Sequence, residues 1–290
     1  DIIRNVSLIF LNTEPLLDFP RPTTHRIIEI GGIVTSTQKP NKLNETWSEI
    51  LNRRPKTVLL SFGTFVKAYA MPDLYKKTIV STLSRFSDVT FIWKYEKPEE
   101  RVTQGAKNIV EAAWLPQVDI LNDPRLSAFI THGGQGSTTE ATMAGVPLVV
   151  IPVATDQLRN AQIIKRNDLG IVLEKEELAD GERLYQAISD VLSDDRYALT
   201  ARRTAEMLKS VPFTAKEKLI RNMEFLVRFG PLRQFDHYGT KLNFIQFYLI
   251  DVFAFFALMA IMLLASAAYI VKSFIRTTYY EKMAKLEKVE

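Results

Sequence analysis

The sequence contains no cysteine, which excludes disulfide bonds and metal sites built from thiolates. It also lacks internal repeats and low-complexity segments. Its first residues, Asp1 to Asn5, do not form a signal peptide, so we expect the chain to begin inside a longer sequence. The hydrophobic fraction of 47% supports a packed core, and 290 residues suit one large domain with an appendage, or two small domains.

Most of the chain has no strong excess of positive or negative residues. The formal net charge is +4, and the tail after residue 271 contributes +2 of it through five basic and three acidic residues. The remainder is therefore nearly balanced and has no basic footprint of the kind that binds nucleic acid. We expect no nucleic-acid partner.

One long hydrophobic run is present. Residues 252–271 are twenty consecutive uncharged residues, and as a helix they would span about 30 Å, the thickness of a bilayer core. A buried core helix is the alternative, but the run has no polar stripe. We therefore predict a transmembrane helix and a lipid bilayer as a partner.

Basic residues near this run predict its orientation. Four lie within fifteen residues after it, and only Lys241 lies within fifteen before it. The positive-inside rule then places the tail in the cytosol and the body in the lumen. In that orientation the sequons at Asn5 and Asn44 are glycosylation candidates, although such triplets often arise by chance.

The body of the chain alternates between short apolar runs and helical patterns. Strands are expected at residues 58–61, 89–93, 108–110, 128–131 and 148–151. Helices are expected at 72–86, 137–144, 156–167, 182–192, 196–208 and 215–228. Strands joined by helical crossovers predict an α/β fold with a Rossmann-like parallel sheet covered on both faces.

The same pattern divides the chain into segments. Residues before 55 are rich in proline and contain only two strand-like pieces, 7–11 and 26–30. The expected segments are the end of a preceding domain with a linker (1–54), an α/β domain (55–235), a juxtamembrane connector (236–251), the transmembrane helix (252–271) and a basic tail (272–290).

Two loops are expected at the carboxyl edge of the sheet, where ligands bind in open α/β folds. In the first, Ser61 and Thr64 offer hydroxyls and Gly63 permits close approach to a phosphate, although a plain turn is the alternative. In the second, a strand ends at His132 and a glycine-rich turn leads to Ser137 at the start of a helix. A helix N-terminus presents unpaired N–H groups to an anion, but a turn that only caps the helix has the same sequence.

Further polar and aromatic residues fall at intervals that suit a sugar nucleotide. Trp114 offers a flat face to a base, and Gln117 suits the ribose or the base edge. Glu140 suits ribose hydroxyls, and Asp156 and Gln157 suit hydroxyls of a sugar. Each has an ordinary structural alternative: a core tryptophan, a satisfied histidine, a solvated glutamate, a helix cap. Their combination in one order across 44 residues favours a single site.

From Trp114 to Gln157 the sequence resembles the donor-site signature of the UDP-glycosyltransferases, animal UDP-glucuronosyltransferase branch, and the resemblance extends over essentially the whole chain. It implies the C-terminal domain of a two-domain GT-B glycosyltransferase. The residues that it assigns to the UDP-sugar are Ser61, Gly63, Thr64, Trp114, Gln117, His132, Gly134, Gly136, Ser137, Glu140, Asp156 and Gln157. At Gly136 many members carry asparagine, so a side-chain phosphate donor is missing here.

The resemblance also implies inverting transfer to a hydroxyl of a small lipophilic acceptor in the endoplasmic reticulum membrane, without metal or cofactor. The family's catalytic base is a histidine of the N-terminal half. None of His25, His132 and His237 matches it, so we expect this chain to bind donor without catalysing transfer.

Two other hypotheses remain open: a non-catalytic membrane partner that associates with full-length subunits as a homo- or hetero-oligomer, and an enzyme with a lipid-linked acceptor. For a glucuronate donor, Lys67 and Arg159 are candidate cations.

Overall fold

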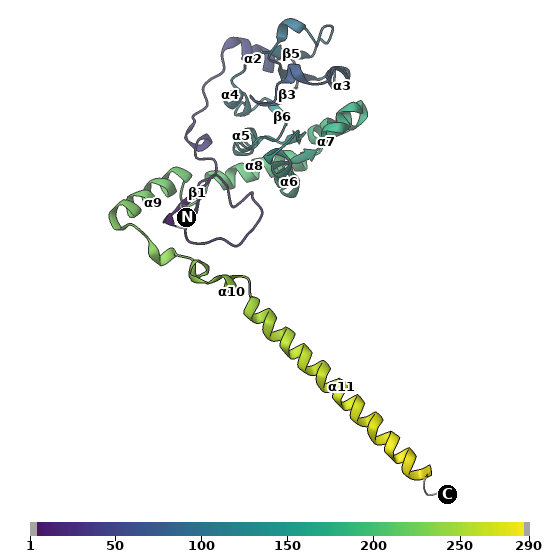
Figure 1. Cartoon of the computed structure of the whole chain (residues 1–290). Helices are drawn as coiled ribbons and strands as arrows, with labels where there is room; N and C mark the ends of the chain where they lie inside the picture. Colours follow the sequence, from purple (N-terminus) through teal and green to yellow (C-terminus); the bar gives the residue numbers. More distant parts are fainter. Residues whose placement is uncertain (1–4, 287–290) are drawn as a thin grey trace. The chain divides into compact units, whose positions relative to one another are not determined.

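The computed structural model describes residues 5–286. The outermost residues of the predicted N-terminal segment (1–4) and basic tail (287–290) lie outside the described range. The chain forms two compact units, one spanning Leu8–Pro231 and the other combining residues up to Ser7 with those from Leu232 onward. Figure 1 labels the elements along the chain.

Six parallel strands form the main sheet of the Leu8–Pro231 unit, in the order β5-β4-β3-β6-β7-β8. Their bounds are β3 Lys56–Ser61, β4 Val89–Lys94, β5 Ile109–Ala112, β6 Leu126–Thr131, β7 Leu148–Val150 and β8 Gly170–Val172. The first five confirm the expected strands. The sixth strand, β8, was not predicted because it has only three residues and begins with a glycine. This glycine, Gly170, lies against the Leu148 carbonyl, where any side chain would clash.

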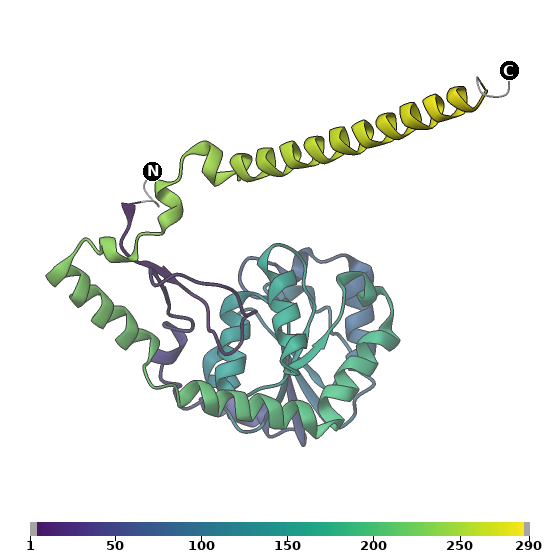
Figure 2. The same ribbon diagram turned by 90° about the horizontal axis from the view of Figure 1, so that it is seen from below.

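Helices connect and cover these strands, as the α/β prediction required. Their bounds are α2 Glu45–Leu51, α3 Asp73–Leu83, α4 Gln117–Leu121, α5 Gln135–Ala144, α6 Asp156–Arg166, α7 Gly181–Ser193, α8 Asp195–Lys209 and α9 Ala215–Phe229. Short 3-10 helices lie at Thr35–Thr37, Ala68–Ala70, Pro98–Glu100 and Lys175–Ala179. Figure 2 shows the helices around the sheet from below.

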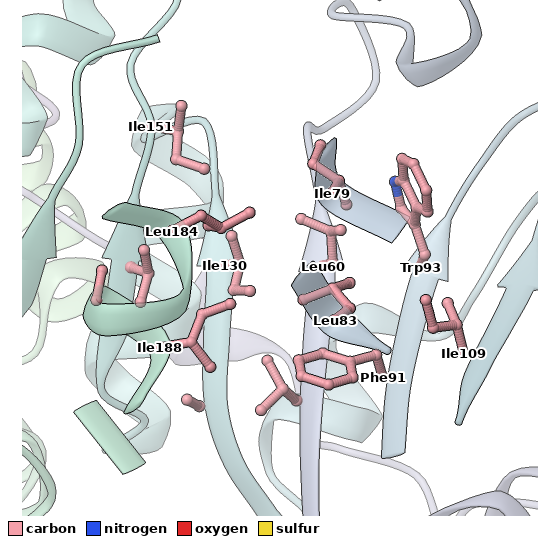
Figure 3. Packing of buried hydrophobic residues seen from close by; sticks show 14 of the residues in the cluster. Leu60, Ile79, Leu83, Phe91, Trp93, Ile109, Ile130, Ile151, Leu184 and Ile188 are labelled. Atoms are coloured by element: carbon pink, nitrogen blue, oxygen red, sulfur yellow. The ribbon is translucent and has the colours of Figure 1, made fainter. Parts of the chain in front are cut away.

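The two faces of the sheet carry separate hydrophobic clusters, because successive strand residues point to opposite faces. On one face Leu60 and Ile130 pack under α3 and α7, where Leu83 and Leu184 point inward (Figure 3). On the other face Phe129 and its neighbours pack under α2, α4, α5, α6 and α8. Both faces are buried, so the strands read as continuous apolar runs rather than alternating ones.

The N-terminal part of this unit contains the two expected strands and one unexpected helix. Strands β1 (Ile9–Leu11) and β2 (Ile27–Glu29) pair in parallel. Helix α2 begins after Asn44, whose side chain accepts a hydrogen bond from the Trp47 backbone N–H and so caps it. Ile50 and Leu51 of this helix are buried in the core, so the segment before residue 55 also contributes to the packing of the sheet.

The second unit consists mainly of α11 (Ile250–Leu286), preceded by short helices at Arg233–Phe235, Tyr238–Lys241 and Phe244–Phe247 (α10). Within α11, Ile250–Met283 is long and apolar enough to cross a membrane, and none of its most hydrophobic window is buried within the protein. This exposure agrees with the predicted transmembrane helix rather than with the alternative, a buried core helix. The helix is longer than residues 252–271 because its polar continuation is also helical.

Candidate functional site

The site is built at the carboxyl ends of three adjacent strands. In the sheet β3 lies between β4 and β6, and Ser61 at the end of β3 pairs in register with Thr131 at the end of β6. Lys94 ends β4 on the other side. The loops that follow these strands therefore begin side by side, as the prediction for this edge required.

His132 lies where the two glycine loops meet. A Cβ atom added to Gly63 would be 2.6 Å from the imidazole Cε1, and one added to Gly134 would be 2.7 Å from Nε2. Both distances are far too short for real contacts, so only glycine at both positions leaves room for the ring. The Gly63 and Gly134 backbones consequently both pack against the Cε1–Nε2 edge of one buried imidazole, and this brings the loop after β3 to the N-terminus of α5.

Burial sets the protonation of this imidazole. Desolvation lowers the pKa of His132 below its usual value near 6.5; the charge of Asp156 acts in the opposite direction, and that of Lys94 lowers the pKa further. The ring is therefore mainly neutral at pH 7. An anion bound beside the ring would raise this pKa again, because a nearby negative charge favours the protonated imidazole.

Helix α5 offers its first N–H groups to this edge. Gly134 is the N-cap, and in the described part of the chain no side chain caps the helix. Ser137 lies in the first turn, one of the two positions expected for it. A Cβ atom at Gly136 would have no heavy atom within 4 Å. The helix end is thus open, and its unpaired N–H groups and positive dipole end suit an anion.

Three predicted residues form one hydrogen-bonded group beside this helix end. Gln117, the first residue of α4, donates from Nε2 to Glu140 Oε2 at 2.7 Å and to Ser137 Oγ at 3.3 Å. The bond to the carboxylate fixes the orientation of Glu140, one turn along α5 from Ser137. The sequence order alone did not predict this contact.

Trp114 is a surface residue rather than a core tryptophan. It is 73% exposed, whereas Trp93 is fully buried. The ammonium group of Lys94 lies 5.2 Å from the centroid of the Trp114 ring. The indole therefore presents a flat, accessible face next to a cation.

Lys94 itself was missed by the sequence reasoning. Its side chain is only 6% exposed and donates to the Gly63 carbonyl oxygen. Burial lowers its pKa, while Glu96 acts in the opposite direction and Lys67 in the same one. The available signal was its position: a lysine directly ending an apolar strand lies at the same edge as Ser61 and Thr131.

Asp156 and Gln157 are the first two residues of α6, and they differ in whether their side-chain oxygens are accessible to a ligand. Asp156 is exposed and accepts hydrogen bonds from Thr155 and Asn160. Gln157 is buried, and its Oε1 accepts from the backbone N–H groups of Val153 and Ala154. The carboxylate therefore remains open to a ligand, whereas the glutamine carbonyl stabilises its own loop.

Asn160 is a second residue that the sequence reasoning missed. It donates to the Asp156 carboxylate and to the Gly133 carbonyl oxygen, each at 3.0 Å, and so links the start of α6 to the glycine turn. The chain conformation at this point is unusual, because Thr155 has a φ of 57°. A left-handed non-glycine residue is a strained feature that clusters at binding loops.

Arg159 and Lys67 are the candidate cations for the carboxylate of a glucuronate donor, and they differ in their surroundings. The guanidinium group of Arg159 pairs with the buried carboxylate of Asp18, so it is not held ready for the carboxylate of a donor sugar. Lys67 is exposed. Within residues 5–286 no group of three or more His, Asp or Glu residues is arranged to hold a metal ion.

The parallel α/β sheet with flanking helices has the fold found in GT-B glycosyltransferase structures. The chain belongs to the family described as UDP-glucoronosyl and UDP-glucosyl transferase, whose sequence model matches residues 1–289.

Relatives and solved structures agree with this assignment. The Caenorhabditis elegans protein ugt-55 is 41% identical over 189 residues, which are 65% of this chain and 36% of that protein. UDP-glucuronosyltransferase 3A1 of Xenopus laevis is 29% identical over 88% of this chain and 48% of its own length. The crystal structure of Os79 from O. sativa in complex with UDP is similar with a TM-score of 0.56 and 22% identity, over 71% of this chain and 51% of that one. The chain thus spans about half the length, or less, of the relatives it matches.

Proposed function

We propose that this chain is the donor-binding half of a glucuronosyltransferase-like UDP-glycosyltransferase. In this proposal the whole enzyme transfers a hexosyl or glucuronosyl group, with inversion and without metal or cofactor, to a hydroxyl of a small lipophilic acceptor. The observation that carries the proposal is the meeting of Gly63, His132 and the open N-terminus of α5 beside exposed Trp114. UDP-sugar is the co-substrate.

The diphosphate would bind between the loop after β3 and the start of α5. The N–H groups at Gly136 and Ser137 and the helix dipole act on its negative charge, and exposed Thr64 lines the other side. The Ser61 hydroxyl is buried and accepts from the Gly63 backbone N–H at 3.3 Å, so it supports this loop. His132 donates to a phosphate oxygen, and the buried ammonium of Lys94 adds a positive charge nearby. This arrangement stabilises the leaving UDP as its charge develops during transfer.

The uridine would lie across the exposed indole of Trp114. Gln117 already holds the Glu140 carboxylate at 2.7 Å, which leaves the carboxylate's other acceptor positions for ribose hydroxyls. Base stacking on an aromatic side chain contributes about 1–3 kcal/mol, so Trp114 is the residue whose removal should weaken UDP binding most clearly.

The transferred sugar would face the start of α6. Asp156 is exposed, and its carboxylate can accept from sugar hydroxyls in addition to Thr155 and Asn160. Gln157 can contribute only its amide nitrogen, because its carbonyl accepts from the Val153 and Ala154 backbone. Since Arg159 is paired with Asp18, these contacts favour hydroxyl recognition and leave glucuronate, glucose, galactose and N-acetylglucosamine as candidate donors.

Acceptor activation needs a general base. His132 is enclosed by Gly63 and Gly134 and assigned to the diphosphate, and neither His25 nor His237 belongs to the site residues. We therefore assign the base to the half that the longer relatives have in addition. The chain alone should bind donor without turnover.

The apolar helix Ile250–Met283 supports a single-pass anchor. We place it in the endoplasmic reticulum membrane with the body lumenal and the tail cytosolic, on the basis of the basic residues after the span. A non-catalytic partner of full-length subunits is the second candidate function.

The test is a calorimetric titration of UDP into the full chain in nanodiscs without added metal, followed by UDP-sugar with a phenolic acceptor. UDP binding with no conjugate formation supports the proposal. Steady conjugate formation by this chain alone would overturn the assignment of the base, and absence of UDP binding by the folded chain would overturn the donor site.

A further inference from the structure

The sequon at Asn44 is a motif that the donor site does not use. Asn44 is followed by Glu45 and Thr46, a triplet that accepts an N-linked glycan in the lumen of the secretory pathway. All three residues are exposed. Residues 38–44 form no helix or strand and lead into α2, which Figure 1 labels. The triplet therefore lies on the surface of the Leu8–Pro231 unit, where a bulky, hydrated group can be accommodated.

The two polar atoms of the Asn44 side chain differ in what they contact. Its Oδ1 accepts from the Trp47 backbone N–H at 3.0 Å and so caps α2. Its Nδ2 donates no hydrogen bond to any residue between 5 and 286, the part of the chain that the structure describes. An N-linked glycan is attached through this nitrogen, and the linked amide keeps its carbonyl oxygen. Glycosylation and capping are therefore compatible at Asn44.

The packing of α2 holds the Asn44 side chain at the surface. Ile50 and Leu51 of this helix are buried in the hydrophobic cluster on one face of the sheet. Arg125 donates to the Ser48 carbonyl oxygen at 3.2 Å and to the Ser48 hydroxyl at 3.0 Å. The helix is thus fixed by its inner side and by its middle turn, and a group attached to Asn44 at its exposed start meets none of these contacts.

The other sequon, at Asn5, has different surroundings. The Ser7 hydroxyl is partly buried and accepts from the Leu232 backbone N–H at 3.0 Å. The hydroxyl of that triplet is thus engaged in the fold, whereas Thr46 is exposed and forms no side-chain hydrogen bond within the described residues. The structure therefore favours Asn44 over Asn5 as a modified residue.

We propose that Asn44 carries an N-linked oligosaccharide. This inference rests on the lumenal orientation of the body that is part of the proposed function. The co-reactant is a lipid-linked oligosaccharide diphosphate. A bond forms between its anomeric carbon and Nδ2 of Asn44, the bond from that carbon to the diphosphate oxygen breaks, and the lipid diphosphate leaves with the bonding electrons while Nδ2 loses one proton. Oδ1 continues to accept from Trp47, so the glycosylated residue still caps α2.

The test is expression of the full chain behind a cleavable signal peptide in animal cells. Microsomal protein is digested with peptide N-glycosidase in heavy-oxygen water, which converts a glycosylated asparagine to labelled aspartate, and the peptide containing Asn44 is analysed by mass spectrometry. We expect the label at Asn44. Thr46→Ser keeps the triplet and should keep the glycan, whereas Thr46→Ala breaks the triplet at the same position and should abolish it. Asn5→Gln should leave the Asn44 glycan in place.

Protease protection of the same microsomes distinguishes failure of this inference from failure of the proposed orientation. A protected body in which Asn44 is unmodified would overturn the inference and leave the orientation and the donor site standing. Digestion of the body from the cytosolic side would overturn the orientation, and the glycan with it. Labelling at Asn44 in the Thr46→Ala variant would contradict the role of the triplet.

Thermal unfolding of the purified variants tests the separate roles of Oδ1 and Nδ2. Asn44→Asp and Thr46→Ala both remove the glycan but keep a side-chain oxygen that caps α2, so their melting temperatures should agree within roughly 2 °C. Asn44→Gln also removes the glycan, and its longer side chain loses the cap, so it should melt roughly 2–4 °C below Asn44→Asp. Equal melting temperatures for the Asp and Gln variants would overturn the claim that Oδ1 caps the helix while Nδ2 carries the glycan.

Discussion

Two glycines at the start of α5 give a matched test of the site. A Cβ atom at Gly134 would lie 2.7 Å from Nε2 of the buried His132 ring, whereas one at Gly136 would have no heavy atom within 4 Å. Gly63 lies against the same ring edge, since a Cβ atom added there would be 2.6 Å from Cε1. Gly134→Ala should therefore strain the core by about 1–3 kcal/mol and displace the imidazole, while Gly136→Ala should stabilise the helix by about 0.4–1 kcal/mol.

The assays are thermal unfolding and UDP titration. About 1 kcal/mol changes the melting temperature by roughly 2–4 °C in a domain of this size, so the two alanine variants should shift it in opposite directions. Gly134→Ala should also weaken UDP binding, and Gly136→Ala should leave it within about twofold. Equal melting temperatures and equal UDP affinities would refute the claim that His132 is confined between the two loops and faces the diphosphate.

Three further predictions concern neighbouring side chains. Burial lowers the pKa of His132, so on acidification the imidazole is protonated in the unfolded chain before it is protonated in the folded chain. The free energy of unfolding should therefore fall as pH drops from about 7 through 6.5 and level off below the lowered pKa. His132→Gln should flatten that slope in urea titrations at several pH values. Lys94→Met should weaken UDP binding about tenfold or more by removing a cation near the diphosphate, and an unchanged dissociation constant would contradict its assigned role. Gly136→Asn should strengthen UDP binding up to about tenfold, since the open space admits a side-chain donor, and weaker binding in the same titration would count against the placement of the phosphate.

The sequence predicted the parts of the fold in which local pattern and tertiary packing agree. The strands around Leu60 and Ile130 were predictable because both sheet faces are buried and the strands read as unbroken apolar runs. The strand at Gly170 was not, since its defining property is a close approach to Leu148 that appears only after folding. Helix α2 was missed because seven residues give too little periodicity to distinguish a helix from a loop.

In the candidate site, too, the sequence predicted some features and not others. The rule that ligands bind at the carboxyl edge of an open α/β sheet predicts one shared location for Ser61, His132 and Ser137. It did not reveal that Gln157 uses its carbonyl to stabilise its own loop, or that Lys94 is buried beside Gly63. Those facts depend on side-chain direction. The position of Lys94 at the end of an apolar strand indicated the sheet edge but not its burial, and nothing in the sequence indicated the hydrogen bonds of the Gln157 carbonyl.

The most direct test of the central claim is the calorimetric titration of UDP into the full chain, without metal, for the parent and for Trp114→Ala. Trp114 is 73% exposed, so its removal should leave the melting temperature unchanged. UDP binding should weaken by about 1–3 kcal/mol, or roughly 5- to 150-fold, through loss of base stacking. Equal UDP affinity in the two folded proteins, or no binding to the parent, would contradict the assignment of this sheet edge as the donor site.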